Sequence, residues 1–338
     1  PYEDDSGTWL SAFVPIKNAD KKTISILQVD EQFDRFIDRV QADLVSELLI
    51  VLVIFIIVII LLYRNVRLLL RKEEIFKRRL EYHSELIEQK NKDITDSLHS
   101  AKKIQKSLLP ADELISSCFA ETALVFMPRD IVSGDFFWLY ETDKFVFLAV
   151  ADCTGHGVPG GFMSMIGQTA LNDIIDLQPE INCGDILREL NVRVKKLIRH
   201  SSSDGMDIGL CRFEKGSTKV MFAGANRPIY IAGDGVSKLI RGDRQGINGY
   251  LDPEHIFTTH ELHLNSGECI YLFSDGYQDQ FGGARGKKFM RKQLCSLIDK
   301  ICTCHMTEQE KILKNAFHEW RGGFDQVDDV LIWGIRIS

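Results

Sequence analysis

A run of sixteen uncharged residues, LLIVLVIFIIVIILLY at positions 48–63, most limits how this chain can fold. As an α-helix it would be about 24 Å long, slightly shorter than the ~30 Å hydrocarbon core of a bilayer. Leu44 and Val45 extend it by a turn. A buried core helix is the alternative, but such a helix rarely shows apolar residues on every face for four turns. We therefore predict one transmembrane helix over residues 44–63.

Basic residues are distributed unevenly around this helix. The segment after it carries Arg64, Arg67, Arg71, Lys72, Lys77, Arg78 and Arg79. The segment before it carries Lys21, Lys22, Arg35 and Arg39. Because basic flanks stay on the cytoplasmic side, we predict a single-pass protein of the cell (inner) membrane, with the whole chain after Tyr63 in the cytoplasm. All eight cysteines lie at or beyond Cys118, which suits free thiols in a reducing compartment.

Residues 1–43 would then be extracytoplasmic. Within them, residues 8–40 suggest two strands around a polar turn at 18–22, followed by a helix that runs into the membrane. This pattern resembles the closing segment of Cache-type extracytoplasmic sensor domains, and a structural stub without sensor function is the alternative. The chain begins at Pro1 without a Met, so we expect a fragment or a processed product.

Residues 64–109 carry an apolar repeat with alternating steps of three and four. Its members are Val66, Leu69, Phe76, Leu80, Ile87, Ile94, Ala101, Ile104 and Leu108. Polar residues interrupt the same stripe at Glu73, His83, Lys90 and Ser97. A 3.5-residue period is typical of a coiled coil, so we predict a coiled-coil linker that forms a homodimer. The alternative is a solvated amphipathic connector. Pro110 ends the helix.

The rest of the chain has the composition and pattern of a globular α+β domain. The chain is 45% hydrophobic and its formal net charge is −7, so no basic excess predicts nucleic acid as a partner. Short β-rich runs occupy residues 123–127, 145–151, 220–223, 229–232, 269–273 and 330–337. Helical stretches occupy residues 161–177, 183–200 and 307–321. Many strands with grouped helices predict sheets packed together.

Four aspartates stand where these strands meet tight turns, namely Asp135, Asp152, Asp275 and Asp328. A charged side chain at the end of a buried strand is costly, and several carboxylates brought together would repel one another. Cations normally hold such a cluster, and hard oxygen ligands suit Mg²⁺ or Mn²⁺. For any one aspartate, a turn or a helix N-cap is the plainer explanation. Four in these contexts favour a metal site.

Five separated motifs follow one another in a defined order. They are SGDFFW (133–138), ADCTGHGVPGGFMSMIG (151–167), AGANRP (223–228), LFSDGYQDQFGG (272–283) and DDVLIWGI (328–335). Together they resemble the SpoIIE/RsbU-type branch of the PPM (protein phosphatase 2C-like) serine/threonine phosphatases. The lead-in AKKIQKSLLP (101–110) resembles the segment that joins a regulatory helix to the catalytic domain in that branch. The resemblance covers about residues 100–338.

This resemblance implies an αββα sandwich over residues 110–338 with two Mn²⁺ or Mg²⁺ ions in a cleft at one end of the sheets. Asp152 would bridge both ions, and the backbone carbonyl of Cys153 would bind the second. Asp135 would anchor the water shell of the second ion, while Asp275 and Asp328 would complete the first. The resemblance places Asp329 and Asp279 in outer or structural roles.

The chemistry implied is in-line attack on phosphorus by a metal-activated water, without a protein nucleophile. His156 could protonate the leaving oxygen or simply fix the glycine-rich turn, and Arg129 could hold the substrate phosphate. Cys153 stands where a Gly is more familiar, and a thiol there would make the site sensitive to oxidation. Leu331 stands where a Thr is common. Neither departure removes a carboxylate.

The sequence therefore predicts a signal-regulated protein phosphatase. By the resemblance, its substrate would be a phosphoserine or phosphothreonine on a regulatory protein of the anti-sigma-factor antagonist kind. A catalytically silent signalling scaffold is the first alternative, and the presence of all four aspartates argues against it. A sensor histidine kinase, suggested by His83 in EYHSELIEQK, is the second alternative. It would need a further glycine cluster that the sequence does not contain.

Overall fold

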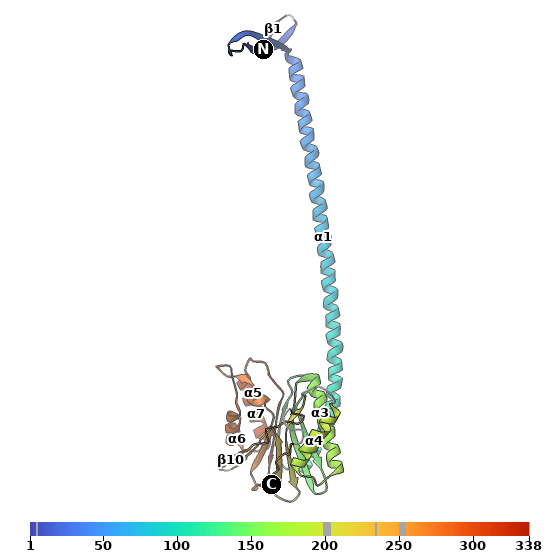
Figure 1. Cartoon of the computed structure of the whole chain (residues 1–338), viewed down its shortest axis with the longest axis vertical. Coiled ribbons are helices and arrows are strands. Elements are labelled where there is room, and N and C mark those ends of the chain that lie inside the picture. Colours follow the sequence, from blue (N-terminus) through green and yellow to red (C-terminus); the bar gives the residue numbers. More distant parts are fainter. Residues whose placement is uncertain (5, 199–203, 234, 250–254, 338) are drawn as a thin grey trace. The chain divides into compact units, whose positions relative to one another are not determined.

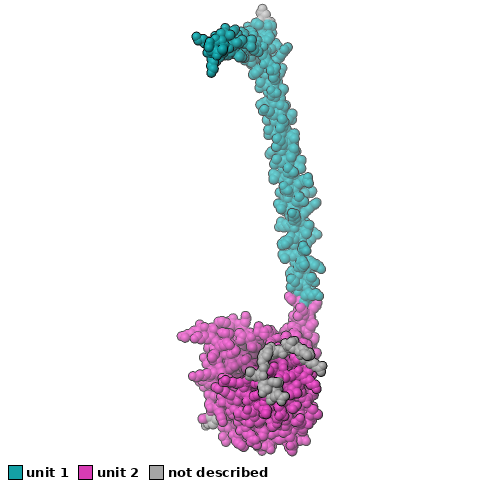
Figure 2. All heavy atoms as spheres, in the orientation of Figure 1, with its two compact units in different colours: residues 1–90 teal, residues 91–338 magenta. Residues whose placement is uncertain are grey.

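The computed structural model describes residues 1–4, 6–198, 204–233, 235–249 and 255–337. It contains two compact units, residues 1–90 and 91–338, which Figure 2 shows in teal and magenta. The second unit therefore includes the last turns of the segment that the sequence assigned to the linker.

The first unit opens with a three-stranded antiparallel sheet in the order β1-β2-β3. Its strands are β1 (Tyr2–Asp4), β2 (Gly7–Lys17) and β3 (Thr23–Gln32). The Asn18 side chain accepts hydrogen bonds from the backbone N–H groups of Asp20 and Lys22, each at 3.0 Å, and so closes the turn between β2 and β3. The two strands expected around residues 18–22 are confirmed.

A single continuous helix, α1 (Phe33–Leu108), follows β3 directly. The predicted transmembrane and linker segments are thus parts of one helix, because residues 33–108 contain neither Gly nor Pro to break it. Within the described residues, α1 is the one helix that is long and apolar enough to cross a membrane, judged by length and composition. The side chains of its apolar stretch are exposed.

The second unit is built on two five-stranded antiparallel sheets. The first has the order β11-β8-β7-β6-β5, with strands β5 (Phe136–Glu141), β6 (Phe145–Cys153), β7 (Met206–Glu214), β8 (Lys219–Ala225) and β11 (His260–His263). The second has the order β10-β9-β12-β15-β4, with strands β4 (Thr122–Met127), β9 (Ile229–Gly233), β10 (Val236–Ile240), β12 (Cys269–Phe273) and β15 (Val330–Arg336). A small ribbon pairs β13 (Phe281–Gly282) with β14 (Lys287–Lys288).

Helices cover the outer face of each sheet (Figure 1). The first sheet is covered by α3 (Gly157–Leu177) and α4 (Cys183–Leu197), and the second by α6 (Arg291–Ile301) and α7 (Met306–Arg321). Two short helices, α2 (Asp112–Cys118) and α5 (Gly276–Asp279), complete the unit. The predicted αββα sandwich is confirmed. The predicted helix at 183–200 ends at Leu197, and residues 199–200 lie outside the described residues.

Strand β6 is an interior strand of the first sheet, and its sequence is apolar at successive positions rather than at every second one. Phe147 and Ala149 belong to the core between the first sheet and α3 and α4. Leu148 and Val150 point the other way, into the core between the two sheets. Because successive side chains of a strand face opposite sides, a strand covered on both faces needs apolar residues at every position.

Candidate active site

Sheet topology brings the four predicted aspartates to one end of the sandwich. In the first sheet, β6 ends where its antiparallel neighbour β5 begins, so Asp152 and Asp135 stand at the same edge. In the second sheet, β12 ends where β15 begins, so Asp275 and Asp328 also share an edge. Antiparallel pairing always sets the end of one strand beside the start of its partner. Residues far apart in the sequence meet for this reason.

A pocket of about 270 Å³ opens between these two edges. Its lining residues are Asp152, Cys153, Thr154, Gly155, His156, Met206, Asp207, Arg227, Asp275 and Asp328. Asp135 is not part of the lining and is only 3% exposed. Three of the four predicted carboxylates thus face one cavity, and the fourth is buried in the loop before β5.

Asp135 has an unusual environment for a carboxylate. Its Oδ2 atom is buried and makes no hydrogen bond. Burial raises the pKa of Asp135 well above its ordinary value, and the charge of Asp152 raises it further. A buried carboxylate oxygen without a partner is costly, and a cation or its bound water would compensate it.

The pKa of Asp152 is also raised by burial. Burial raises the pKa of Asp152 from 3.8 to about 8, the Arg227 guanidinium opposes this rise, and the charge of Asp275 adds to it. Burial also raises the pKa of Asp328 and of Asp207. This pocket gathers more negative charge than one guanidinium neutralises, which is the condition under which carboxylates bind divalent cations.

The guanidinium of Arg227 lies in the pocket among these carboxylates. It lies between β8 and β9, and its Nη2 donates a hydrogen bond to Asp152 and another, of 2.9 Å, to Asp275 Oδ2. The same nitrogen is 3.6 Å from Asp207 Oδ2. Although burial lowers the pKa of Arg227, these three carboxylates raise it above its ordinary value.

Sequence reasoning missed both Arg227 and Asp207. Arg227 belongs to the AGANRP motif, which was one of the five that carried the family resemblance, so a signal for it existed. The preceding Asn226 has a left-handed backbone (φ 59°) and donates its Nδ2 to Asp207 Oδ1 at 2.8 Å. Asp207 itself had no signal, because it stands at the start of an ordinary apolar strand.

Cys153 offers its backbone at the end of β6, while its side chain is only 4% exposed. Burial raises the pKa of the Cys153 thiol well above its ordinary value, and the charge of Asp152 adds to the rise. Because the thiolate is the form that reacts with oxidants, the structure does not support the expected sensitivity to oxidation.

His156 and Arg129 occupy different surroundings. His156 lines the pocket, and its Nδ1 is 2.7 Å from Asp130 Oδ2. Arg129 is not part of the pocket lining, and its Nη1 donates to the carbonyl of Val327 at 2.9 Å. The phosphate-binding role expected of Arg129 therefore has no contact to support it, whereas Arg227 presents a guanidinium in the pocket.

The two remaining aspartates lie outside the pocket lining. Asp329 is 2% exposed and accepts hydrogen bonds from the backbone N–H groups of Arg129 and Gly134, each at 2.7 Å. Asp279 is half-exposed and forms an ion pair of 2.9 Å with Lys288. Asp329 thus ties the loop before β15 to the loop that carries Asp135.

The donor set suits a hard divalent cation. Among the described residues, no three side chains of the His, Cys, Asp and Glu types converge closely enough to hold an ion by themselves. The oxygen donors present are carboxylates and the Cys153 backbone, with a buried Asp135 oxygen that lacks a partner. Mg²⁺ commonly binds through one or two carboxylates and keeps several waters, so a set of this kind fits it and the similar Mn²⁺.

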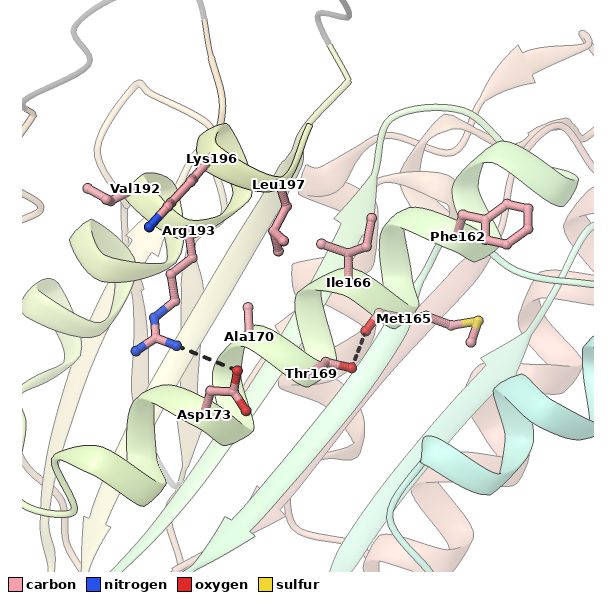
Figure 3. Close-up of a pocket in the computed structure, with 10 residues that line it drawn as sticks. All are labelled: Phe162, Met165, Ile166, Thr169, Ala170, Asp173, Val192, Arg193, Lys196 and Leu197. Atoms are coloured by element: carbon pink, nitrogen blue, oxygen red, sulfur yellow. Dashed lines mark hydrogen bonds and ion pairs between the residues drawn. The ribbon is translucent and has the colours of Figure 1, made fainter. Parts of the chain in front are cut away.

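A larger hollow of about 910 Å³ lies elsewhere, between α3 and α4 (Figure 3). Apolar side chains such as Phe162, Ile166 and Leu197 line it. Its one ion pair joins Asp173 to Arg193 across the two helices at 3.6 Å. Because it gathers no set of carboxylates or other reactive groups, the smaller acidic pocket is the candidate active site.

Known proteins resemble this chain in sequence and in fold. A family model described as Stage II sporulation protein E (SpoIIE) matches residues 142–338. The phosphoserine phosphatase RsbU of Bacillus subtilis (strain 168) is 24% identical over 191 residues, which are 54% of this chain and 54% of RsbU. This chain thus spans about half the length of that curated relative.

Two solved structures show the fold. The SiaA-PP2C domain of Pseudomonas aeruginosa is 29% identical, with a TM-score of 0.68 over 73% of this chain and 98% of that one. The PP2C phosphatase domain of SpoIIE from Bacillus subtilis, solved with a fragment of its regulatory domain, is 17% identical, with a TM-score of 0.54 over 64% and 63% of the two chains. Since the family model covers more than half of its length, this chain belongs to the SpoIIE family, and its second unit has the PP2C phosphatase fold.

Proposed function

We propose that this chain is a metal-dependent protein serine/threonine phosphatase. The observation that carries the proposal is the meeting of Asp152, Asp275 and Asp328 in one pocket, with the buried Asp135 beside it, whose Oδ2 has no hydrogen-bond partner. Membership of the SpoIIE family supports the reaction, and the likeness to RsbU supports phosphoserine as the substrate group.

In this proposal the pocket holds two Mn²⁺ or Mg²⁺ ions. Asp152, Asp275, Asp328 and the Cys153 carbonyl would hold these ions, and Asp135 would accept a hydrogen bond from a water bound to them. When bound, the ions supply the charge that stabilises the phosphoryl oxygens and activates water for in-line attack. The four carboxylates are the residues of this chain that fix where the phosphoryl group sits.

Two further residues of the pocket act on the substrate. Arg227 fixes Asp152 and Asp275 by hydrogen bonds and presents its charge to the phosphoryl group. Because Asp130 engages Nδ1 of His156, Nε2 is the ring nitrogen that remains to give a proton to the leaving serine or threonine oxygen. Asp130 thereby orients the imidazole for this step.

The protein substrate in this proposal is a phosphorylated regulatory protein of the anti-sigma-factor antagonist kind. The support is the family resemblance of the five motifs and the likeness to RsbU. Purified candidate antagonists phosphorylated on Ser or Thr test it directly. Release of phosphate from such a protein at a rate well above that from p-nitrophenyl phosphate would support this assignment, and equal rates would contradict it.

We also propose that residues 44–63 cross the cell membrane once, that residues 1–43 are extracytoplasmic, and that residues 64–109 form a dimeric stalk leading to the catalytic domain. The exposed apolar stretch of α1 and its basic C-terminal flank support this arrangement. A membrane-impermeant maleimide should label the partly exposed Cys295 and Cys304 only after the membrane is opened. Labelling in intact cells would contradict the orientation.

The enzymatic proposal is tested on the full chain in detergent micelles. Hydrolysis of p-nitrophenyl phosphate and of a phosphoserine peptide is measured across a Mn²⁺ titration, for wild type and for Asp152→Asn. Asp143→Asn is the matched control, because Asp143 is exposed in the turn between β5 and β6, away from the pocket.

We expect turnover to require Mn²⁺, to persist in Asp143→Asn and to disappear in Asp152→Asn. If wild type and Asp152→Asn are equally inert at every Mn²⁺ concentration, also in a version dimerised by a fused coiled coil, the enzymatic proposal fails. The silent-scaffold alternative would then hold.

A further inference from the structure

Gln105 is the one buried residue of α1, a helix whose other side chains are exposed or partly exposed. It is 7% exposed and stands in the AKKIQKSLLP segment, within the second unit. A Gln at this position would ordinarily face water, as Lys102, Lys103 and Lys106 do. Its burial therefore calls for partners that satisfy the carboxamide.

The Gln105 carboxamide is satisfied by the loop before β5 and by α3. Its Nε2 donates to the carbonyl of Ser133 at 2.6 Å and to Ser164 Oγ at 2.8 Å. Its Oε1 accepts from the backbone N–H of Ser133 at 3.1 Å. Gln105 thus binds both polar groups of one residue's backbone, and both of its donors are used. Ser133 stands two positions before Asp135.

The loop that carries Asp135 packs closely against the backbone of Cys153 and Gly155. A Cβ atom on Gly134 would lie 2.5 Å from the carbonyl oxygen of Gly155 and 3.3 Å from that of Cys153. The N–H of Gly134 donates to Asp329 Oδ2 at 2.7 Å. A displacement of Ser133 is therefore transmitted to Asp135 in one direction and to the Cys153 carbonyl in the other.

We propose that Gln105 is a positioning residue through which the linker helix holds the loop of Asp135. The inference rests on the proposed function, because it assigns to this loop the second metal position. With Gln105 in place, Asp135 and the Cys153 carbonyl keep the spacing that the ion requires. When the last turns of α1 shift or unwind, the Ser133 backbone loses both hydrogen bonds and this spacing relaxes.

The structure leaves room for such a movement. A hollow of about 580 Å³ lies beside Gln105, between the end of α1 and the side chains of Phe126 and Phe137. Removing a partner that orients a metal ligand typically lowers metal affinity or activity about 10-fold to 100-fold. The Mn²⁺ affinity of the second position should fall by this factor when Gln105 is replaced.

The test compares Gln105→Met with Lys103→Met in the full chain in detergent micelles. Met is unbranched and favours helix, so Gln105→Met removes the hydrogen bonds while keeping bulk and helix propensity. Lys103→Met introduces the same residue at an exposed position of the same helix. Mn²⁺ binding is measured by calorimetry without substrate, and amide hydrogen exchange is measured for the peptide covering residues 130–137.

Gln105→Met should weaken Mn²⁺ binding about 10-fold to 100-fold and speed exchange at residues 133–135, and Lys103→Met should change neither. At limiting Mn²⁺, kcat should fall while KM for the phosphopeptide stays unchanged, and added Mn²⁺ should restore kcat. If Gln105→Met does not fold, the same measurements are made on Gln105→Ala, which adds no atoms. Unchanged exchange in a folded Gln105 variant refutes the inference. Absence of Mn²⁺ binding by wild type would instead refute the proposed function.

Discussion

Replacing Arg227 by Met should destabilise the metal-free chain by an amount that the structure bounds. The guanidinium is 9% exposed and binds Asp152 and Asp275, with Asp207 at 3.6 Å. Removing one partner of a fully buried ion pair costs about 3–5 kcal/mol, because the other charge is left buried and unpaired. Here Asp275 and Asp207 are 35% and 33% exposed, so water compensates part of that loss.

We therefore expect a loss of about 2–3 kcal/mol in the free energy of unfolding. For a unit that covers residues 91–338, this corresponds to a fall in Tm of about 4–12 °C. The assay is thermal unfolding of the full chain in EDTA, followed by near-ultraviolet circular dichroism. Saturating Mn²⁺ should recover most of the fall, because bound cations neutralise the same carboxylates.

Lys144→Met is the matched control for this experiment. Lys144 forms an ion pair with Glu180, but the two side chains are 67% and 63% exposed. Such pairs contribute about 0–1 kcal/mol, so the control should leave Tm nearly unchanged. An equal Tm for wild type and Arg227→Met in EDTA would refute the reasoning, and so would a fall in Tm that Mn²⁺ does not reduce.

Three further predictions address the same domain and its linker. Burial raises the pKa of Asp152 from 3.8 to about 8, so between these values the folded chain holds a proton that the unfolded chain has released. In EDTA the contribution of Asp152 to the free energy of unfolding should therefore fall from about pH 4 to about pH 8. The difference in Tm between about pH 5 and about pH 8 should be smaller in Asp152→Asn than in wild type. Gly134→Ala places a Cβ 2.5 Å from the Gly155 carbonyl oxygen and should lower kcat about 100-fold, whereas Gly323→Ala, with open space around it, should keep full activity. Ile94→Glu puts a charge on the exposed apolar stripe of α1 and should shift the chain from dimer to monomer in light scattering, and a wild-type monomer would contradict the predicted stalk.

Local patterns were enough to predict most of the architecture. The apolar run at 48–63 and the 3.5-residue repeat after it predicted helical segments over residues 44–63 and 64–109. The structure joins them in one helix, because no Gly or Pro interrupts residues 33–108. The β-rich run predicted at residues 145–151 lies within β6, whose two faces are both buried. Asp135, Asp152, Asp275 and Asp328 were predicted from turns at strand ends, and the antiparallel topology places them at one end of the sandwich.

Tertiary structure alone decided which other side chains join them. Asp207 enters the pocket because β7 pairs with β6 and sets Asp207 opposite Asp152. Arg227 enters it from the connection between β8 and β9. Gln105 contacts the loop of Asp135 because α1 ends against α3 and that loop. The hydrogen bonds of Gln105 and of Arg227 join residues 28 to 75 positions apart, so no local spacing encodes them. They follow from strand order and from the packing of helices on sheets, which depend on the whole domain.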